Sequence, residues 1–155
     1  MNAERNSNRT RRRIAVAAVI AGLLTTAACG HLAMMGSTER PEAAAFGTGP
    51  RVSTTHRYTA TLEPREPLRL RQLLSVPVRI TDVSGRPVTN ATVTVDGGMP
   101  EHGHGLPTQP RVTRSSAEGV YEIEGLRFSM GGWWEVKLCI DSPAGQDNVT
   151  FNLSL

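Results

Sequence analysis

The sequence predicts an all-β protein: a small antiparallel β-sandwich of about seven strands with an immunoglobulin-like architecture, preceded by a helical signal or lipoprotein leader. From residue 51 onward, apolar and polar residues alternate with a period of two in short stretches, and clusters of Gly, Pro, Ser and Asp separate these stretches. After the leader, no stretch has the 3.6-residue apolar period of an amphipathic helix. With 155 residues, the chain has room for one domain once the leader is removed.

Each stretch of alternating residues defines one expected strand. By residue range, the expected strands are 58–62, 68–80, 91–95, 111–114, 120–123, 134–140 and 149–153. In the second range the alternation places Leu70 on the same inward face as Val76 and Ile80. The segment Asp82–Pro87 has turn chemistry and ends that strand.

The first 28 residues have the organisation of a signal peptide. Four arginines between residues 9 and 13 precede an apolar run at 14–28, which ends in small residues. Because this run is shorter than the roughly 20 residues that cross a bilayer as a helix, removal of the leader is favoured over an uncleaved anchor. The sequence therefore predicts export to the cell envelope.

Cys29 indicates a lipoprotein leader. The segment Leu24–Gly30 resembles a bacterial lipobox, in which the cysteine is lipidated and becomes the first mature residue, although Thr26 stands where leucine is usual. The alternative is ordinary secretory cleavage after Ala28. Lipidation predicts a protein tethered to the membrane and facing the periplasm or the outside. With Cys29 lipidated, no intramolecular disulfide is expected for Cys139.

Composition divides the mature chain into a tether at 29–50 and a domain at 51–155. The tether is rich in Ala, Gly, Ser, Thr, Glu and Pro and has no sustained apolar period. Five of the 17 basic residues and one of the 14 acidic residues precede Cys29, which leaves the mature chain at about −1. Without the leader there is no basic patch interleaved with aromatic residues, so nucleic-acid binding is not expected.

The segment Asp96–Pro110 is the strongest candidate for a functional site, as a loop rich in glycine and proline after the third strand. In an extended backbone His102 and His104 point to the same side, so both imidazoles can reach one ion. Met99 adds a soft thioether. The alternative is an ordinary surface turn with solvated histidines.

A second segment supplies further candidates. Met130 precedes Gly131 and Gly132, and its sulfur joins the histidines if the strand ends meet at one pole of the sandwich; otherwise it is a core methionine. Trp133 and Trp134 point to opposite sides of a strand. One is therefore expected in the core, and the other is expected to cover a ligand site or a partner surface.

Two imidazoles and one or two thioethers suit Cu(I); histidines with water alone suit Cu(II) or Zn(II). Copper fits this set best. The sequence has no Gly-rich phosphate loop opening a helix and no nucleophile elbow, so the protein is not expected to be an enzyme.

The order of these residues resembles the YtkA-like/FixH-like family of exported bacterial domains, some of which are labelled auxin-binding proteins. The resemblance covers 76–155 and rests on two motifs, Met99-Pro-x-His-Gly-His-Gly105 and Phe128-x-Met-x-Gly-x-Trp134. It implies a small exported sandwich with a link to copper handling or to respiratory oxidase assembly. A lipobox-like leader stands here where FixH-type proteins have a transmembrane helix.

Two functions follow as expectations. The first is a membrane-tethered, non-catalytic protein that binds or handles copper through Met99, His102, His104 and Met130. The alternative is a module of the cell envelope that binds an envelope protein partner or a small ligand, with a structural His-Gly loop.

Overall fold

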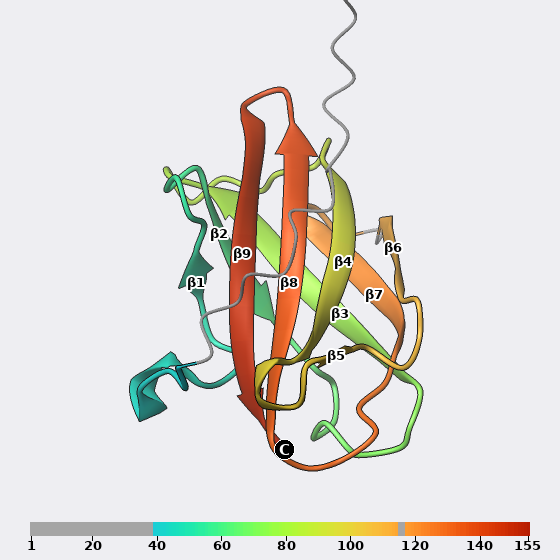
Figure 1. Cartoon of the computed structure of the whole chain (residues 1–155). Coiled ribbons are helices and arrows are strands. Elements are labelled where there is room, and N and C mark those ends of the chain that lie inside the picture. The colour runs from blue at the N-terminus through green and yellow to red at the C-terminus, as the bar shows by residue number, and fades with distance from the viewer. Residues whose placement is uncertain (1–38, 115–116) are drawn as a thin grey trace, which may run out of the picture.

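Two antiparallel sheets pack face to face in the computed structural model, which describes residues 39–114 and 117–155 (Figure 1). The five-stranded sheet has the order β1 (Arg51–Val52), β2 (Tyr58–Leu62), β3 (Leu74–Asp82), β7 (Val120–Leu126) and β6 (Arg111–Arg114). The four-stranded sheet has the order β5 (His104–Gly105), β4 (Thr92–Met99), β8 (Trp133–Ser142) and β9 (Gly145–Ser154). Two single-turn 3₁₀ helices, η1 (Ala43–Ala45) and η2 (Pro100–His102), lie in the connections.

This arrangement confirms the predicted β-sandwich. Among the described residues, the strands with four or more residues match the seven predicted stretches, and the additional strands β1 and β5 have two residues each. The predicted leader helix, the lipobox and the first part of the tether lie outside the described residues. No helix within 39–114 and 117–155 is long and apolar enough to span a membrane.

The core lies between the sheets and is built from alternate residues of the long strands. One hydrophobic cluster contains the fully buried side chains of Val78 and Ile80 from β3, Val136 and Leu138 from β8, and Phe151 from β9. Each such side chain contributes about 1.5–3 kcal/mol by leaving water. The period of two read from the sequence therefore identifies the inward faces correctly.

The second predicted strand begins later than expected. β3 starts at Leu74, and Leu70 is exposed in the preceding loop, so the prediction that Leu70 faces the core is wrong. Arg71 adopts a left-handed conformation (φ 62°), and its N–H donates to Phe128 O at 2.6 Å. This turn interrupts the alternation, and apolar parity alone does not reveal it.

The third predicted strand ends later than expected, because β4 continues through Gly97 and Gly98 to Met99. A Cβ atom at Gly97 would collide with Glu135 O on β8, and one at Gly98 would collide with His104 O on β5. The two glycines therefore allow neighbouring backbones to approach closely within the sheet.

Part of the predicted tether, residues 39–50, lies against the four-stranded sheet. The Phe46 ring packs edge-on to Trp133 with 6.4 Å between ring centroids, and Gly47 N donates to Asn152 O at 2.8 Å. This segment covers the outer face of β8 and part of the exposed edge of β9.

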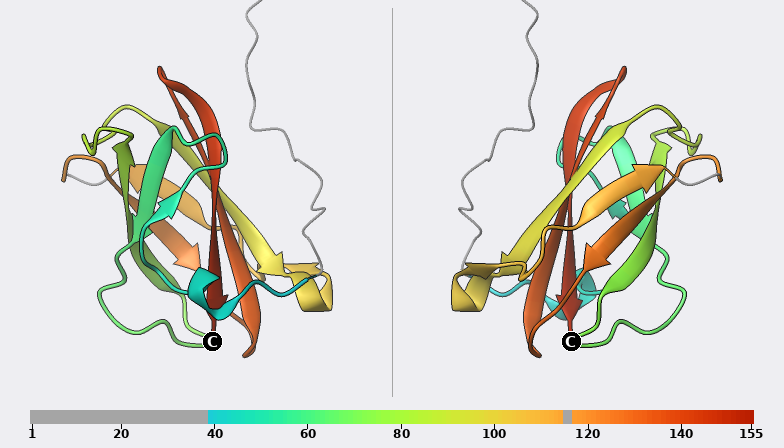
Figure 2. Two further views of the ribbon diagram at one scale, coloured as in Figure 1. Left: turned by 90° about the vertical axis from the view of Figure 1, so that its left-hand side faces the viewer. Right: turned by 90° about the vertical axis from the view of Figure 1, so that its right-hand side faces the viewer.

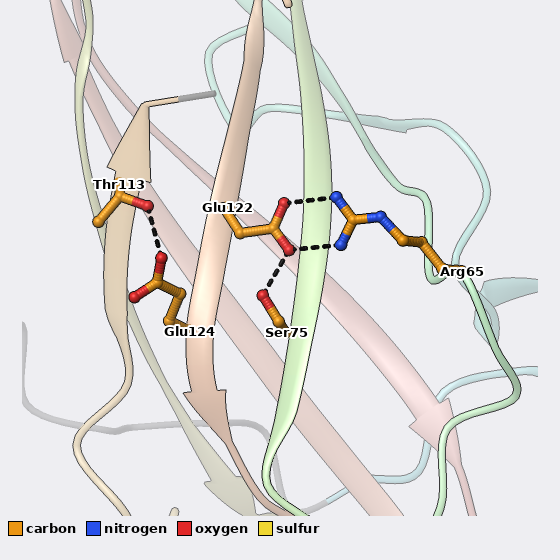
Figure 3. Close-up of polar contacts among 5 residues, drawn as sticks. All are labelled: Arg65, Ser75, Thr113, Glu122 and Glu124. Carbon is orange, nitrogen blue, oxygen red and sulfur yellow. Dashed lines mark hydrogen bonds and ion pairs between the residues drawn. The ribbon is translucent and has the colours of Figure 1, made fainter. Parts of the chain in front are cut away.

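The outer face of the five-stranded sheet is polar (Figure 3). Arg65 makes a two-pronged ion pair with Glu122 at 2.8 and 3.0 Å, and Ser75 donates to the same carboxylate. The hydrogen bond from Arg65 is the main cause that lowers the pKa of Glu122. Thr113 donates to Glu124 at 3.0 Å. Because the arginine is exposed to water, this network stabilises the fold only weakly.

Asp147 ties the loop before β2 to the four-stranded sheet. Its buried carboxylate accepts hydrogen bonds from Thr55 N and Oγ1, the latter at 2.7 Å, and from Arg57 N at 3.3 Å. Burial raises the pKa of Asp147, but hydrogen bonds from Ser53, Thr55 and Asn148 outweigh that effect and lower the pKa well below its usual range.

This lowered pKa predicts an acid-sensitive fold. Because the carboxylate is stabilised only in the folded state, its contribution is complete above the unfolded pKa of about 3.9 and is lost as the pH falls toward the lower folded pKa. We expect D147N to lower the free energy of unfolding by about 2–3 kcal/mol at neutral pH. Urea denaturation from pH 7 to pH 2 measures this. Between pH 7 and pH 2, the free energy of unfolding should fall less in D147N than in the wild type, and E124Q should behave as the wild type does. An equal fall in D147N and in the wild type would contradict the role assigned to Asp147.

Candidate metal centre

The predicted site residues gather at one end of the sandwich, where β4 and β7 end and β8 begins; we call this end the histidine pole. It contains η2 and β5 after β4, and the turn 127–132 between β7 and β8. Figures 1 and 2 show both connections at this end, together with the end of β9 and the loop 63–73. The expectation that the strand ends bring these two segments to one pole therefore agrees with the fold.

His102 and His104 are exposed neighbours whose rings stack, with 5.8 Å between centroids and 26° between planes. They meet for a different reason from the one expected. His102 belongs to the 3₁₀ turn η2 rather than to an extended segment, and Gly103 is left-handed (φ 66°) with its N–H donating to Met99 O at 2.9 Å. The tight turn, rather than strand alternation, brings the two rings to the same side.

The distance between the two ring centroids is compatible with one shared ion. Bonds of about 2.0 Å from two imidazole nitrogens to one ion place the ring centroids roughly 4 to 6 Å apart, and the observed 5.8 Å lies in this range. His104 Nδ1 lies 3.2 Å from Gly105 O. A proton on Nδ1 therefore donates to this carbonyl and leaves Nε2 as the nitrogen that can bind an ion.

The two methionines differ in accessibility. Met99 pairs with His104 across the β4–β5 ladder, yet its side chain is only 1% exposed and its Cε packs against Gly132. A Cβ atom at Gly132 would lie 2.8 Å from that methyl carbon. Met130, in contrast, is 41% exposed. Met99 is therefore a core residue beneath the histidines, whereas Met130 is partly exposed to solvent.

Trp134 connects the loop that carries the histidines to the turn 127–132. Its indole N–H donates to Met130 O at 2.9 Å, and its ring lies edge-on to the His104 ring at 5.9 Å. Phe128 packs against the same indole at 5.3 Å. A single core side chain thus contacts the histidine loop and fixes the backbone of Met130.

Both tryptophans are fully buried. Trp134 points into the core as expected, whereas Trp133 lies on the opposite face of β8 under Phe46 and donates from Nε1 to Asn152 Oδ1 at 2.9 Å. Neither ring therefore offers an open surface to a ligand or partner in this structure.

One ion pair borders the histidines. Arg40 Nη1 lies 3.4 Å from Glu101 Oε1, and the same guanidinium lies 5.3 Å from the centroid of the Phe46 ring. Glu101 is thus engaged with the segment before η1. Within residues 39–114 and 117–155, no group of three or more His, Cys, Asp or Glu side chains is arranged to hold a metal ion, so a site here needs methionine sulfur or exogenous ligands beside the two imidazoles.

Cys139 is disulfide-bonded, which differs from the expectation that it would have no disulfide. It lies on β8 with Glu135 and Lys137, on the face away from Val136. The chain has two cysteines, and the other, Cys29, lies outside the described residues. Cys139 is therefore not a candidate thiolate ligand.

A family model described as YtkA-like matches residues 54–139. The chain belongs to the YtkA-like family. The YtkA-like match runs from the loop before β2 into β8 and contains every methionine, histidine and tryptophan of the candidate site. This confirms the family resemblance read from the two sequence motifs.

No curated protein matches this YtkA-like chain. Among solved structures, it is similar to the ZirS C-terminal domain, with a TM-score of 0.38 and 10% identity over 79% of this chain and 86% of that chain.

Proposed function

We propose that this YtkA-like protein is a non-catalytic copper-binding protein exported to the cell envelope, which binds one Cu(I) through His102 and His104. The observation that supports it best is the pair of exposed imidazoles stacked at 5.8 Å. The tight turn closed at Gly103 holds both imidazoles on one side of the loop, where both can reach one ion.

Met130 is the third ligand in this proposal. Met130 is 41% exposed, and Trp134 holds its backbone through the indole N–H while contacting His104 with its ring. Imidazole and thioether together favour Cu(I) over harder divalent ions. Met99 supports the turn from below, since its side chain is enclosed by the core.

Titration of the purified protein with Cu(I) against a chromophoric competitor tests the proposal. We expect one equivalent of copper to bind, and we expect the thermal midpoint to rise, because a ligand present at 100 times its Kd stabilises the folded state by about 2.7 kcal/mol. Failure to compete for one equivalent, together with an unchanged midpoint, would contradict copper binding.

The alternative module that recruits a partner through an exposed tryptophan edge receives no support from the geometry, because both indoles are enclosed. A small ligand stacked on these rings is disfavoured for the same reason.

A further inference from the structure

A carboxylate lies next to the two histidines in the sequence but outside the candidate ligand set. Glu101 stands directly before His102 in η2. Successive side chains of a 3₁₀ turn point about 120° apart, so Glu101 and His102 leave the turn in different directions. In agreement with this, no group of three His, Cys, Asp or Glu side chains in the described part of the chain is arranged to hold a metal ion. The carboxylate of Glu101 is thus directed elsewhere.

Arg40 is the partner of this carboxylate. Its Nη1 donates to Glu101 Oε1 at 3.4 Å, a contact between residues 61 positions apart in the sequence. The same guanidinium lies 5.3 Å from the centroid of the Phe46 ring. Because a cation above an aromatic ring is attracted to its face, Phe46 restrains the guanidinium beside η2.

The segment 39–50 that carries Arg40 is itself anchored to the sandwich. Figure 2 shows its first residues, in cyan, beside η2, in yellow. Further along the segment, Gly47 N donates to Asn152 O at 2.8 Å, and Phe46 forms a parallel bridge with Asn152. The position of Arg40 beside η2 therefore follows from contacts that the segment makes with β9, as well as from the ion pair.

The position of this carboxylate bears on which ions the histidines suit. Two imidazoles, one carboxylate and a water form a common zinc site, whereas two imidazoles with a thioether favour Cu(I). To bind Zn(II), the carboxylate of Glu101 has to give up its contact with Arg40. Cu(I) bound by the histidines and Met130 leaves that contact intact. The ion pair therefore opposes the harder ion and leaves Cu(I) unaffected.

We propose that Arg40 is a specificity-determining residue: by pairing with Glu101, it keeps a hard oxygen ligand away from the two imidazoles and so lowers the affinity for Zn(II) relative to Cu(I). This inference rests on the proposed binding of a metal ion by His102 and His104. It adds that a residue from the segment before β1 takes part in the choice of that ion.

Titration of Zn(II) and Cu(I), each against a chromophoric chelator, tests the proposal in the wild type and in R40Q, R40K, E101Q and R40Q/E101Q. We expect the affinity for Zn(II) to rise roughly fivefold in R40Q, which is the size of effect that one exposed ion pair supplies. The affinity for Cu(I) should stay within about twofold of the wild type. R40K keeps the positive charge and should keep the wild-type ratio of the two affinities. R40Q/E101Q should match E101Q, because neither contains the carboxylate.

The carboxyl carbon of Glu101 gives a second measurement, which separates metal binding by the carboxylate from a change of charge. In protein labelled with carbon-13, Zn(II) should shift the Glu101 carboxyl signal in R40Q and should leave it in place in the wild type. R69Q is the matched control. Arg69 is exposed in the loop 63–73 at the same pole, so its loss removes one positive charge without touching Glu101 and should change neither the signal nor the two affinities.

Equal ratios of the two affinities in R40Q and in the wild type would overturn the role of Arg40. A rise in Zn(II) affinity from E101Q to R40Q/E101Q as large as the rise from the wild type to R40Q would overturn it too, because charge alone would then explain the effect. So would a Glu101 signal that Zn(II) shifts in the wild type. If the wild type and R40Q both fail to bind Cu(I), the proposed function has failed; if both bind Cu(I) with the same preference over Zn(II), only the role of Arg40 has failed.

Discussion

Replacing His102 and His104 together by alanine is expected to lower the affinity for Cu(I) by more than roughly 100-fold, because ligands in direct contact with a metal contribute more than the supporting residues whose loss costs 10- to 100-fold. The two rings are exposed and make few packing contacts. Competition with a chromophoric Cu(I) chelator measures the change. The free energy of unfolding without copper should change by less than about 0.5 kcal/mol.

His56 provides the matched control for this result. It is an exposed histidine in the loop before β2 and is left-handed (φ 60°), a conformation that asparagine tolerates well. H56N should therefore keep wild-type affinity. If H102A/H104A binds Cu(I) as tightly as H56N does, the two loop histidines are not the ligands.

The two methionines should separate stability from binding. M99A is expected to lower the free energy of unfolding by about 2–5 kcal/mol, since it removes a side chain that is 1% exposed and packs against Gly132. M130A should leave stability within about 0.5 kcal/mol of the wild type and should weaken Cu(I) binding roughly tenfold or more. Urea denaturation and the chelator titration measure the two effects.

M99L is the control for packing, because it keeps the volume of the side chain and removes the sulfur. We expect M99L to retain most of the stability and all of the affinity for copper. Weaker copper binding in M99L with unchanged binding in M130A would exchange the roles of the two methionines.

The sequence predicts the fold well because burial in a sandwich imposes a period of two on every long strand. Val76–Ile80 and Val136–Ile140 show the pattern clearly, and both are buried as expected. The pattern fails at Leu70, where the left-handed Arg71 interrupts the alternation. Such a turn needs a hydrogen bond to Phe128 O, a long-range contact that no local pattern encodes.

The candidate site is predicted in part. The sequence places the two histidines together, although the cause is the 3₁₀ turn closed at Gly103 rather than an extended strand. It cannot separate Met99 from Met130, because their burial depends on how β4, β8 and the turn before β8 meet. The contact of Trp134 with His104 is likewise missed, since it joins residues 30 positions apart. The hydrogen bond from the Trp134 indole to Met130 O, four positions away, depends on the shape of the turn before β8 and is missed as well.

X-ray absorption at the copper edge, recorded on the protein loaded with one equivalent of Cu(I), tests the central claim most directly. The account predicts two nitrogen scatterers at about 2.0 Å with the multiple-scattering pattern of imidazole, and one sulfur scatterer at about 2.3 Å that disappears in M130A. The imidazole pattern should be absent from the spectrum of H102A/H104A. A spectrum without imidazole scattering in the wild type, or one that is unchanged in H102A/H104A, would contradict it.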